Sequence, residues 1–454
     1  MRNYNDNGGK GWRFMSIIKK HRVLLLFVCL MVATFWGSTW FNEWVKLSDF
    51  SRKISTVFLY SPFVVFIIEK LIGDFKNKKV NAFNIFYYLF AVYFGALSVY
   101  RMFFSSGIKE MFYVSVVFFG SLALFSNIVN KYYCITKKDI FNDLWIYSVL
   151  YVIFYFIDDL ILSNYMYLSP INYLYGVGSM IMMLPIIVQK IKTANSLGSR
   201  ILAVLVLAFT WLIIFTRGSR ALFVLSFIVI VAVFLSNLKN KLAIKRMFVS
   251  ALICIFSLFI VLFFDVNEAR NNFFRSLSIS SDSKIISMIP KNNPNKDSDD
   301  EAEKEEINDL IAQIERSDNM RADLLEYGLA EFKKNPLFGT GNIYYTYHIS
   351  GWTFEQETHN FIVQTLAGYG IVGLVFCAIL LILIMLQTGM FNFKNIKRLS
   401  FMLENYSVIM FFFGLGMVQP AVYNTQLLPL MMTLFAYLEL NKNENSDKYI
   451  EDTK

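Results

Sequence analysis

Residues 201–240 read ILAVLVLAFTWLIIFTRGSRALFVLSFIVIVAVFLSNLKN. Two apolar runs, 201–216 and 220–238, flank the short turn Thr216-Arg217-Gly218-Ser219-Arg220. A helix of about 20 predominantly apolar residues is long enough to cross the hydrocarbon core of a bilayer. The stretch therefore predicts two membrane helices joined by a turn that carries two arginines.

The composition of the whole chain agrees with a membrane protein. Of its 454 residues, 56% are hydrophobic and 17% are charged, whereas a soluble domain carries about 25% charged residues. The 46 Phe and 25 Tyr fit lipid-facing surfaces and interfacial belts. The net charge of +9 does not indicate a nucleic-acid partner, because the basic residues cluster in short loops, where they orient and anchor membrane helices.

Apolar runs of this kind recur twelve times, which predicts an all-α polytopic membrane protein with about 12 transmembrane helices. They lie near 23–41, 54–72, 83–103, 108–130, 140–162, 171–191, 201–216, 220–238, 247–265, 360–387, 400–418 and 421–439. The least regular are 54–72 and 421–439, which contain proline and polar residues. No small-residue cleavage pattern follows 23–41, so we read this run as the first membrane helix.

Positive charge orients the helices. With the basic N-terminus inside, alternate loops carry Lys76, Lys78, Lys79, Lys131, Lys137, Lys138, Lys190, Lys192, Lys239, Lys241, Lys245, Arg246, Lys394, Lys397 and Arg398. Such loops mark the cytoplasmic side. We therefore expect cytoplasmic termini at 1–22 and 440–454, and membrane helices within 23–265 and 359–439. The same count places Arg217 and Arg220 on the outward side, where arginine is disfavoured.

A long outward-facing loop, residues 266–358, separates the ninth and tenth runs. It holds 17 of the 34 acidic and 10 of the 43 basic residues, a formal charge of −7. Apolar residues recur at helical spacing within 301–314, and a second short helix is predicted from about 319 to 334, before Pro336. Asn335–Gly341, NPLFGTG, is typical of a turn, and an aromatic stretch follows at 344–352.

Arg217 and Arg220 are the first candidate binding residues. An arginine pair near helix ends often only extends toward lipid headgroups. Here, however, Gly218 and Ser219 form a tight turn, and glycine allows a ligand to approach the backbone closely. Guanidinium groups bind phosphate oxygens bidentately. We therefore predict that the pair, and Arg220 above all, binds an anionic ligand.

His359 is the candidate general base. It stands where the long loop ends and the run 360–387 begins, on the same side as the two arginines. A lone histidine is more often structural, but the positive end of a helix dipole favours the neutral imidazole that can accept a proton. His348 is a weaker candidate. Loop arginines that could join the site are Arg270, Arg275, Arg316 and Arg321, although each alone is typical of a solvated charge.

Neither a metal site nor a cofactor site is predicted. The four cysteines, Cys29, Cys134, Cys254 and Cys377, form no CxxC pair and are read as small buried hydrophobes. Asp297-Ser298-Asp299 matches the DxD of metal-dependent sugar-nucleotide transferases, but it lies in an acidic run, which is more typical of a solvated segment.

The order of these motifs resembles the O-antigen ligase and polymerase superfamily. The resemblance rests on Thr216–Arg220 entering a helix, the large loop ending in Asn335–Gly341, the triplet His359-Asn360-Phe361, and Ala367-Gly-Tyr-Gly370-Ile-Val-Gly373. It covers about 210–390 in detail. It implies a GT-C-like, metal-independent glycosyltransferase of the bacterial inner membrane, whose site faces the periplasm and whose long loop is periplasmic.

The resemblance also implies roles and partners. The donor would be an undecaprenyl-diphosphate-linked oligosaccharide, held in membrane lipid and bound through its diphosphate by Arg220, Arg217, Arg321 and Arg275. His359 would activate or position the acceptor hydroxyl. A chain-length regulator protein is a further expected partner.

Within the superfamily, a polymerase joins repeat units on the lipid carrier, and a ligase transfers the finished chain to the lipid A core. The long acidic loop and the chain length favour the polymerase. A flippase for lipid-linked oligosaccharide is the alternative of another class. The absence of an internal repeat, the long outer loop and the scarcity of charge inside the predicted helices weigh against it.

Overall fold

The structure is a computed structural model. It describes residues 20–36, 49–78, 81–104, 108–133, 135–156, 173–217, 220–264, 323–341, 344–349, 352–358, 360–391, 405–417 and 427–451. Within these ranges the chain is mainly helical.

Each of the twelve apolar runs overlaps a helix in the described part of the chain. In chain order the helices are α2 (Arg22–Trp36), α4 (Asp49–Asn77), α5 (Ala82–Phe104), α6 (Ile108–Val129), α7 (Lys137–Phe156), α9 (Tyr173–Thr193), α10 (Leu197–Arg217), α11 (Arg220–Ser236), α12 (Lys241–Phe263), α15 (Phe361–Gln387), α18 (Ser407–Gly416) and α19 (Leu427–Glu451). Two helices differ clearly from the prediction: α4 is longer than the run 54–72 at both ends, and α19 extends well beyond residue 439.

Three stretches of the described chain are long and apolar enough to cross a membrane: Leu197–Phe215, Lys241–Phe263 and Phe361–Gln387. Shorter apolar stretches occur in α2, α5, α6, α11, α18 and α19. These helices are those of a membrane protein. That all twelve runs cross the bilayer stays a prediction.

The long loop contains a β-hairpin that the all-α prediction did not include. β1 (Tyr344–Ile349) pairs antiparallel with β2 (Trp352–Glu357), with Tyr344 opposite Glu357. Aromatic and β-branched residues favour extended backbone, and they are frequent in both strands. The short helix predicted before Pro336 is confirmed over residues 323–334. The one predicted within 301–314 lies outside the described residues.

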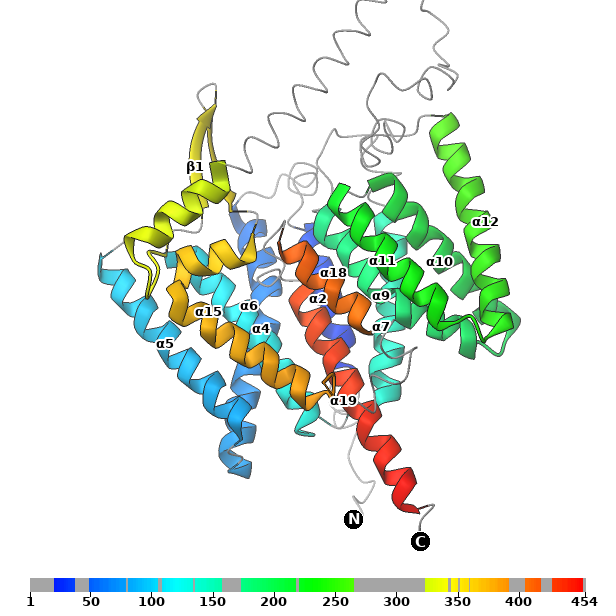
Figure 1. The fold of residues 1–454 in the computed structure, drawn as a ribbon, viewed down its shortest axis with the longest axis horizontal. Coiled ribbons are helices and arrows are strands. Elements are labelled where there is room, and N and C mark those ends of the chain that lie inside the picture. The colour runs from blue at the N-terminus through cyan, green and yellow to red at the C-terminus, as the bar shows by residue number, and fades with distance from the viewer. Residues whose placement is uncertain are drawn as a thin grey trace, which may run out of the picture.

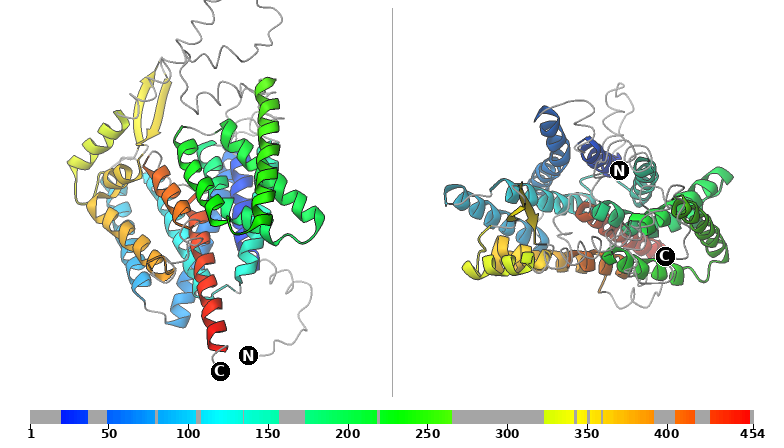
Figure 2. Two further views of the ribbon diagram at one scale, coloured as in Figure 1. Left: turned by 45° about the vertical axis from the view of Figure 1, so that its right-hand side comes forward. Right: turned by 90° about the horizontal axis from the view of Figure 1, so that it is seen from above.

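The helices pack side by side into an elongated bundle (Figures 1 and 2). α5 and α12 lie at opposite edges in Figure 1, with α15 packed on α5 and α10 packed on α12. One hydrophobic core runs from α2 to α19. Aromatic rings join α5 to α15, as in the pair Phe90 and Phe376, whose ring centroids lie 5.1 Å apart, and the pair Phe94 and Tyr369, at 4.3 Å. Such pairs contribute about 0.5–1.5 kcal/mol beyond their buried area.

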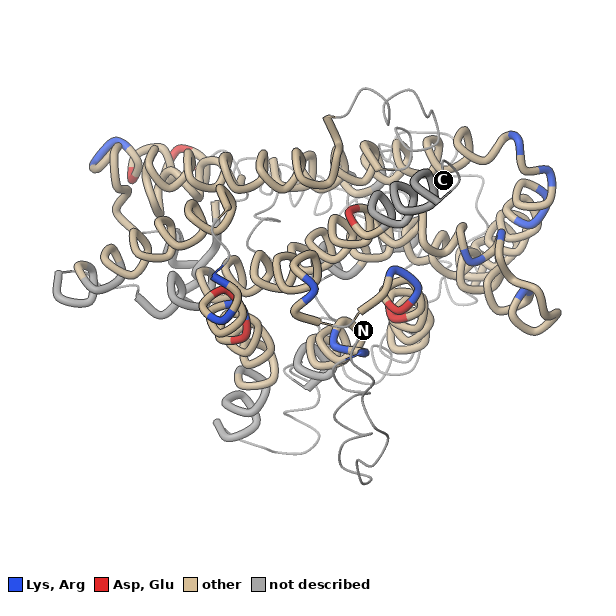
Figure 3. Tube along the Cα trace, turned by 90° about the horizontal axis from the view of Figure 1, so that it is seen from below, with Lys and Arg blue, Asp and Glu red and all other residues tan. Residues whose placement is uncertain are grey.

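Most of the described basic residues lie at helix ends and in the turns between helices (Figure 3). The turns after α9 and α11 carry Lys192, Lys239 and Lys241 and lie at the lower end of the bundle in Figure 1. α10 ends and α11 begins at the opposite, upper end. This arrangement agrees with the expected alternation of basic and non-basic loops. Which end faces the cytoplasm stays a prediction.

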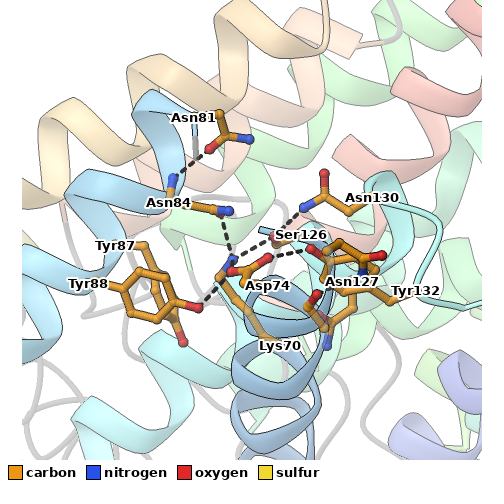
Figure 4. A network of polar contacts seen from close by, with 12 residues as sticks. Lys70, Asp74, Asn81, Asn84, Tyr87, Tyr88, Ser126, Asn127, Asn130 and Tyr132 are labelled. Carbon is orange, nitrogen blue, oxygen red and sulfur yellow. Dashed lines mark hydrogen bonds and ion pairs between the residues drawn. The ribbon is translucent and has the colours of Figure 1, made fainter. Parts of the chain in front are cut away.

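A buried polar cluster ties α4, α5 and α6 together (Figure 4). The Lys70 ammonium is fully buried and donates to Asp74 Oδ2 at 2.6 Å, Asn84 Oδ1 at 2.7 Å and Ser126 Oγ at 2.9 Å. The Tyr88 hydroxyl donates to the same carboxylate. All three ammonium hydrogens therefore have acceptors, which is what allows a lysine to remain inside a protein.

Another charged side chain is buried in the bundle, so the expected scarcity of charge inside the helices needs correction. Asp143 of α7 is fully buried, with His21 Nδ1 2.7 Å from its Oδ1. Arg22 forms an ion pair with Glu69 of α4. These pairs connect α2 to its neighbours α4 and α7. Each of these charges faces an oppositely charged or hydrogen-bonding partner, which is typical of structural charges and not of a transport path.

Candidate active site

The upper end of the bundle brings together the helix ends that carry the candidate residues. Arg217 is the last residue of α10, and Arg220 is the first residue of α11. The positions of their side chains are outside what the structure describes. The backbone nevertheless places both arginines at one corner between two helices, as the sequence motif requires (Figure 1).

The last turn of α18 packs against the beginning of α11. Gly414 provides the close approach, because a Cβ at this position would lie 2.7 Å from Leu225 Cδ2. Leu225 stands little more than one helical turn after Arg220. The end of α18 therefore lies near the arginine-bearing start of α11.

The same turn of α18 also holds the start of α15. The Asn360 side chain caps α15 by accepting from the backbone N–H groups of Ile362 at 3.0 Å and Val363 at 3.1 Å. Its Nδ2 donates to the Met417 carbonyl at 3.1 Å. Gly416 leaves room for the Phe361 ring, since a Cβ there would lie 2.8 Å from it. α18 thus bridges the start of α11 and the start of α15.

The helix at 323–334 covers the start of α15 from another side. A Cβ on Gly328 would lie 2.5 Å from Val363 Cγ1 and 2.8 Å from Thr358 Cγ2. Thr358 is buried in this contact. The loop helix that follows Arg321 in sequence therefore packs on the segment that contains His359.

The Asn335–Gly341 turn inserts into a break in α15. Gly370 has φ 68° and ψ −170°, which interrupts the helix. The turn supplies the missing partners: the backbone N–H of Thr340 donates to Ala367 O at 2.8 Å, and Ile371 N–H donates to Pro336 O at 2.9 Å. Glycine is required because a Cβ on Gly370 would lie 2.2 Å from Leu337 O.

A buried carboxylate fixes this turn to its helix. Glu331 is almost fully buried and accepts from Thr340 Oγ1 at 2.8 Å through its Oε2. Its Oε1 pairs with Lys334. The long loop is therefore anchored to α15 by side-chain and backbone hydrogen bonds over residues 331–341.

The structure places some of the predicted residues and leaves others undescribed. His359, Arg321 and Arg275 lie outside the described residues, although Thr358 and Asn360 bracket His359. His348 lies in β1 opposite Thr353. Within the described chain, no group of three His, Cys, Asp or Glu residues is arranged to hold a metal ion.

The sequence analysis did not single out the Asn360 cap or the break at Gly370. The Asn360 cap could have been predicted, because asparagine directly before an apolar run is an N-cap signal.

This end of the bundle has the electrostatic character of an anion site. α11 and α15 both begin here, and the N-terminus of a helix carries a partial positive charge. Two arginines at the α10–α11 corner add full charges. An anionic group would be stabilised here, and the polar segment around Asn360 lies at the same end.

A comparison with known proteins matches the same segments of the chain. Residues 202–378 match a family model described as O-antigen ligase. No curated protein and no solved structure matches the chain. The match begins in α10 and ends in α15, so it contains both arginines, the long loop and the capped start of α15. Members of this family are glycosyltransferase-like enzymes that act on lipid-linked polysaccharides. The resemblance seen in the motifs is thereby confirmed: residues 202–378 are similar to the O-antigen ligase and polymerase superfamily.

Proposed function

We propose that the protein is an O-antigen polymerase, a metal-independent glycosyltransferase that joins undecaprenyl-diphosphate-linked repeat units at the periplasmic face of the bacterial inner membrane. The observation that carries the proposal is the bridge made by α18 at the upper end of the bundle. It joins the start of α11, which carries Arg220, to the capped start of α15, which follows His359. The family match over the same segments supports it.

In the proposed reaction, Arg217 and Arg220 bind the diphosphate of the donor, assisted by Arg321 and Arg275 from the loop. The bond between the anomeric carbon and the diphosphate oxygen breaks, and undecaprenyl diphosphate leaves with the electron pair. The arginines stabilise the charge that grows on the leaving group, and removing one such donor typically costs about 10²–10³ in rate.

His359 completes the chemistry on the acceptor side. It takes the proton of the attacking sugar hydroxyl while that oxygen forms the new glycosidic bond. General base catalysis of this kind contributes about 10²–10⁴-fold. Strand β1, which shortly precedes His359 in sequence, contains tyrosines at residues 344, 345 and 347, and aromatic rings are suited to binding sugars.

Ligation is the second candidate, because the matched family model is described by that activity. A ligase would use the same donor and leaving group, but its acceptor would be the lipid A core. The chain length and the long acidic loop favour the polymerase. A chain-length regulator is its proposed partner in the membrane.

The test is the lipopolysaccharide ladder of a deletion strain complemented with variants. We expect the deletion to show core plus one repeat unit, and wild type to restore the ladder. Arg220→Ala and His359→Ala should each reduce polymer by at least about 10²-fold. Arg200→Ala is the matched control, since Arg200 lies near the other end of α10 and bonds the Ala194 carbonyl.

The other outcomes of this test are equally specific. Bare core with long chains on the lipid carrier would show a ligase, and bare core without such chains would show a flippase. A full ladder from both Arg220→Ala and His359→Ala would refute the proposed mechanism.

A further inference from the structure

Gln364 of α15 is a buried amide without hydrogen-bond partners. Its side chain is 1% exposed, and neither Nε2 nor Oε1 has a partner in the structure. Nearby polar side chains are satisfied: Thr365 Oγ1 donates to Phe361 O, and Asn360 bonds three backbone groups. A buried amide with no partner destabilises a fold, so native proteins rarely keep one without a use for it.

The position of Gln364 places this amide at the candidate active site. It stands one turn after Asn360, about 6 Å further along the helix axis. Around the axis it lies about 60° from Phe361, which packs on α18, and about 100° from Val363, which packs on the 323–334 helix. The amide therefore lies between two packed faces, next to the helix ends that converge with α11.

The donor and acceptor atoms of the Gln364 amide indicate which kind of ligand it can bind. Diphosphate oxygens only accept hydrogen bonds, so Oε1 of Gln364 has nothing to accept from them. A sugar hydroxyl both donates and accepts, and two neighbouring hydroxyls satisfy Nε2 and Oε1 together. We propose that Gln364 binds the hydroxyl groups of the donor sugar that is bonded to the diphosphate. This inference rests on the proposed function, in which the arginines hold the diphosphate and leave the adjoining sugar to be recognised.

The test separates sugar recognition from diphosphate recognition and from folding. Purified wild type, Gln364→Met and Arg220→Ala are compared in detergent for binding of two probes. One probe is undecaprenyl diphosphate, and the other is the lipid-linked repeat unit extracted from the deletion strain. Gln364→Met replaces the amide with an apolar side chain of similar shape. Thr365→Val is the matched control, because it alters a buried polar group on the same turn of the same helix.

We expect Gln364→Met to bind undecaprenyl diphosphate as wild type does and to bind the repeat unit about 10- to 100-fold more weakly. Its melting temperature should equal or exceed that of wild type, since the variant removes an unsatisfied buried amide. Arg220→Ala should weaken binding of both probes. Thr365→Val should bind both as wild type does.

Two results would overturn the proposal: unchanged binding of the repeat unit by Gln364→Met, or equal weakening of both probes. Failure of the proposed function looks different. If wild type does not elongate extracted repeat units, polymerisation is refuted, while the binding comparison still decides what Gln364 recognises.

Discussion

At the scale of single residues, Asp74 shows how a charge is kept inside this bundle. Its carboxylate accepts hydrogen bonds from Lys70, Tyr88 and Tyr132. Burial raises the pKa of Asp74, but these three hydrogen bonds and the positive charge of Lys70 together lower it below the ordinary value of 3.8. The ionised carboxylate therefore stabilises the folded state above pH 3.8, and this contribution is lost as the pH falls through the lowered pKa.

Asp74→Asn should therefore destabilise the protein in a pH-dependent way. At pH 7 we expect a loss of about 3–5 kcal/mol, because the variant leaves the buried Lys70 ammonium without its ionic partner. As the pH falls below about 4, the difference in melting temperature between wild type and variant should shrink, since the unfolded wild type then takes up a proton at Asp74 while the folded state resists protonation. Thermal unfolding in detergent from pH 3 to 7 measures the loss of stability at pH 7 and the decrease of the difference at low pH. A constant difference over this range would contradict the assigned role of the carboxylate.

At the scale of elements, the break in α15 and the loop turn that fills it act as one unit. The backbone of residues 336–341 takes the place of the helical hydrogen bonds that α15 loses around Gly370. The turn in Asn335–Gly341 and the end of the preceding helix at Pro336 were predictable, because proline and glycine act locally. The insertion of this turn into the break in α15 could not be predicted, since it depends on contact between segments about 30 residues apart in sequence. Ser350-Gly351 between two aromatic segments is a turn signal that the sequence interpretation did not use for the hairpin.

Gly370→Ala should separate the turn from the helix. The backbone conformation at Gly370 is strained for any other residue, and the added Cβ would meet the Leu337 backbone, which has little room to move. We expect a loss of at least about 3 kcal/mol and a shortened or absent ladder. Gly95→Ala in α5 is the control, because a Cβ there has nothing within 4 Å and should leave stability unchanged or raise it. A wild-type melting temperature for Gly370→Ala would show that the turn is not held by this contact.

At the scale of the whole molecule, each apolar run predicted from the sequence overlaps a helix in the described part of the chain, because apolar helices are marked by their own composition. It did not predict which helices touch. The bridge from α11 through α18 to α15 depends on Gly414 and Gly416. Small residues in an apolar run indicate that another helix packs closely there, but they do not indicate which helix it is. Likewise, Lys70 lies near the end of the predicted run 54–72, and only the folded chain shows the acceptors on α5 and α6 that surround it.

The orientation of the whole bundle is the remaining prediction. If basic loops face the cytoplasm, the turn between α9 and α10 lies inside, and the loop helix at 323–334 lies in the periplasm. Ser196 and Lys333 are both exposed and suit single-cysteine labelling in a variant whose four native cysteines are replaced by alanine. A membrane-impermeant maleimide, applied to cells with a permeabilised outer membrane, should label Lys333→Cys at once. Ser196→Cys should react only after the inner membrane is disrupted. The reverse pattern would place the arginine-bearing end in the cytoplasm, where the periplasmic reaction proposed for it could not occur.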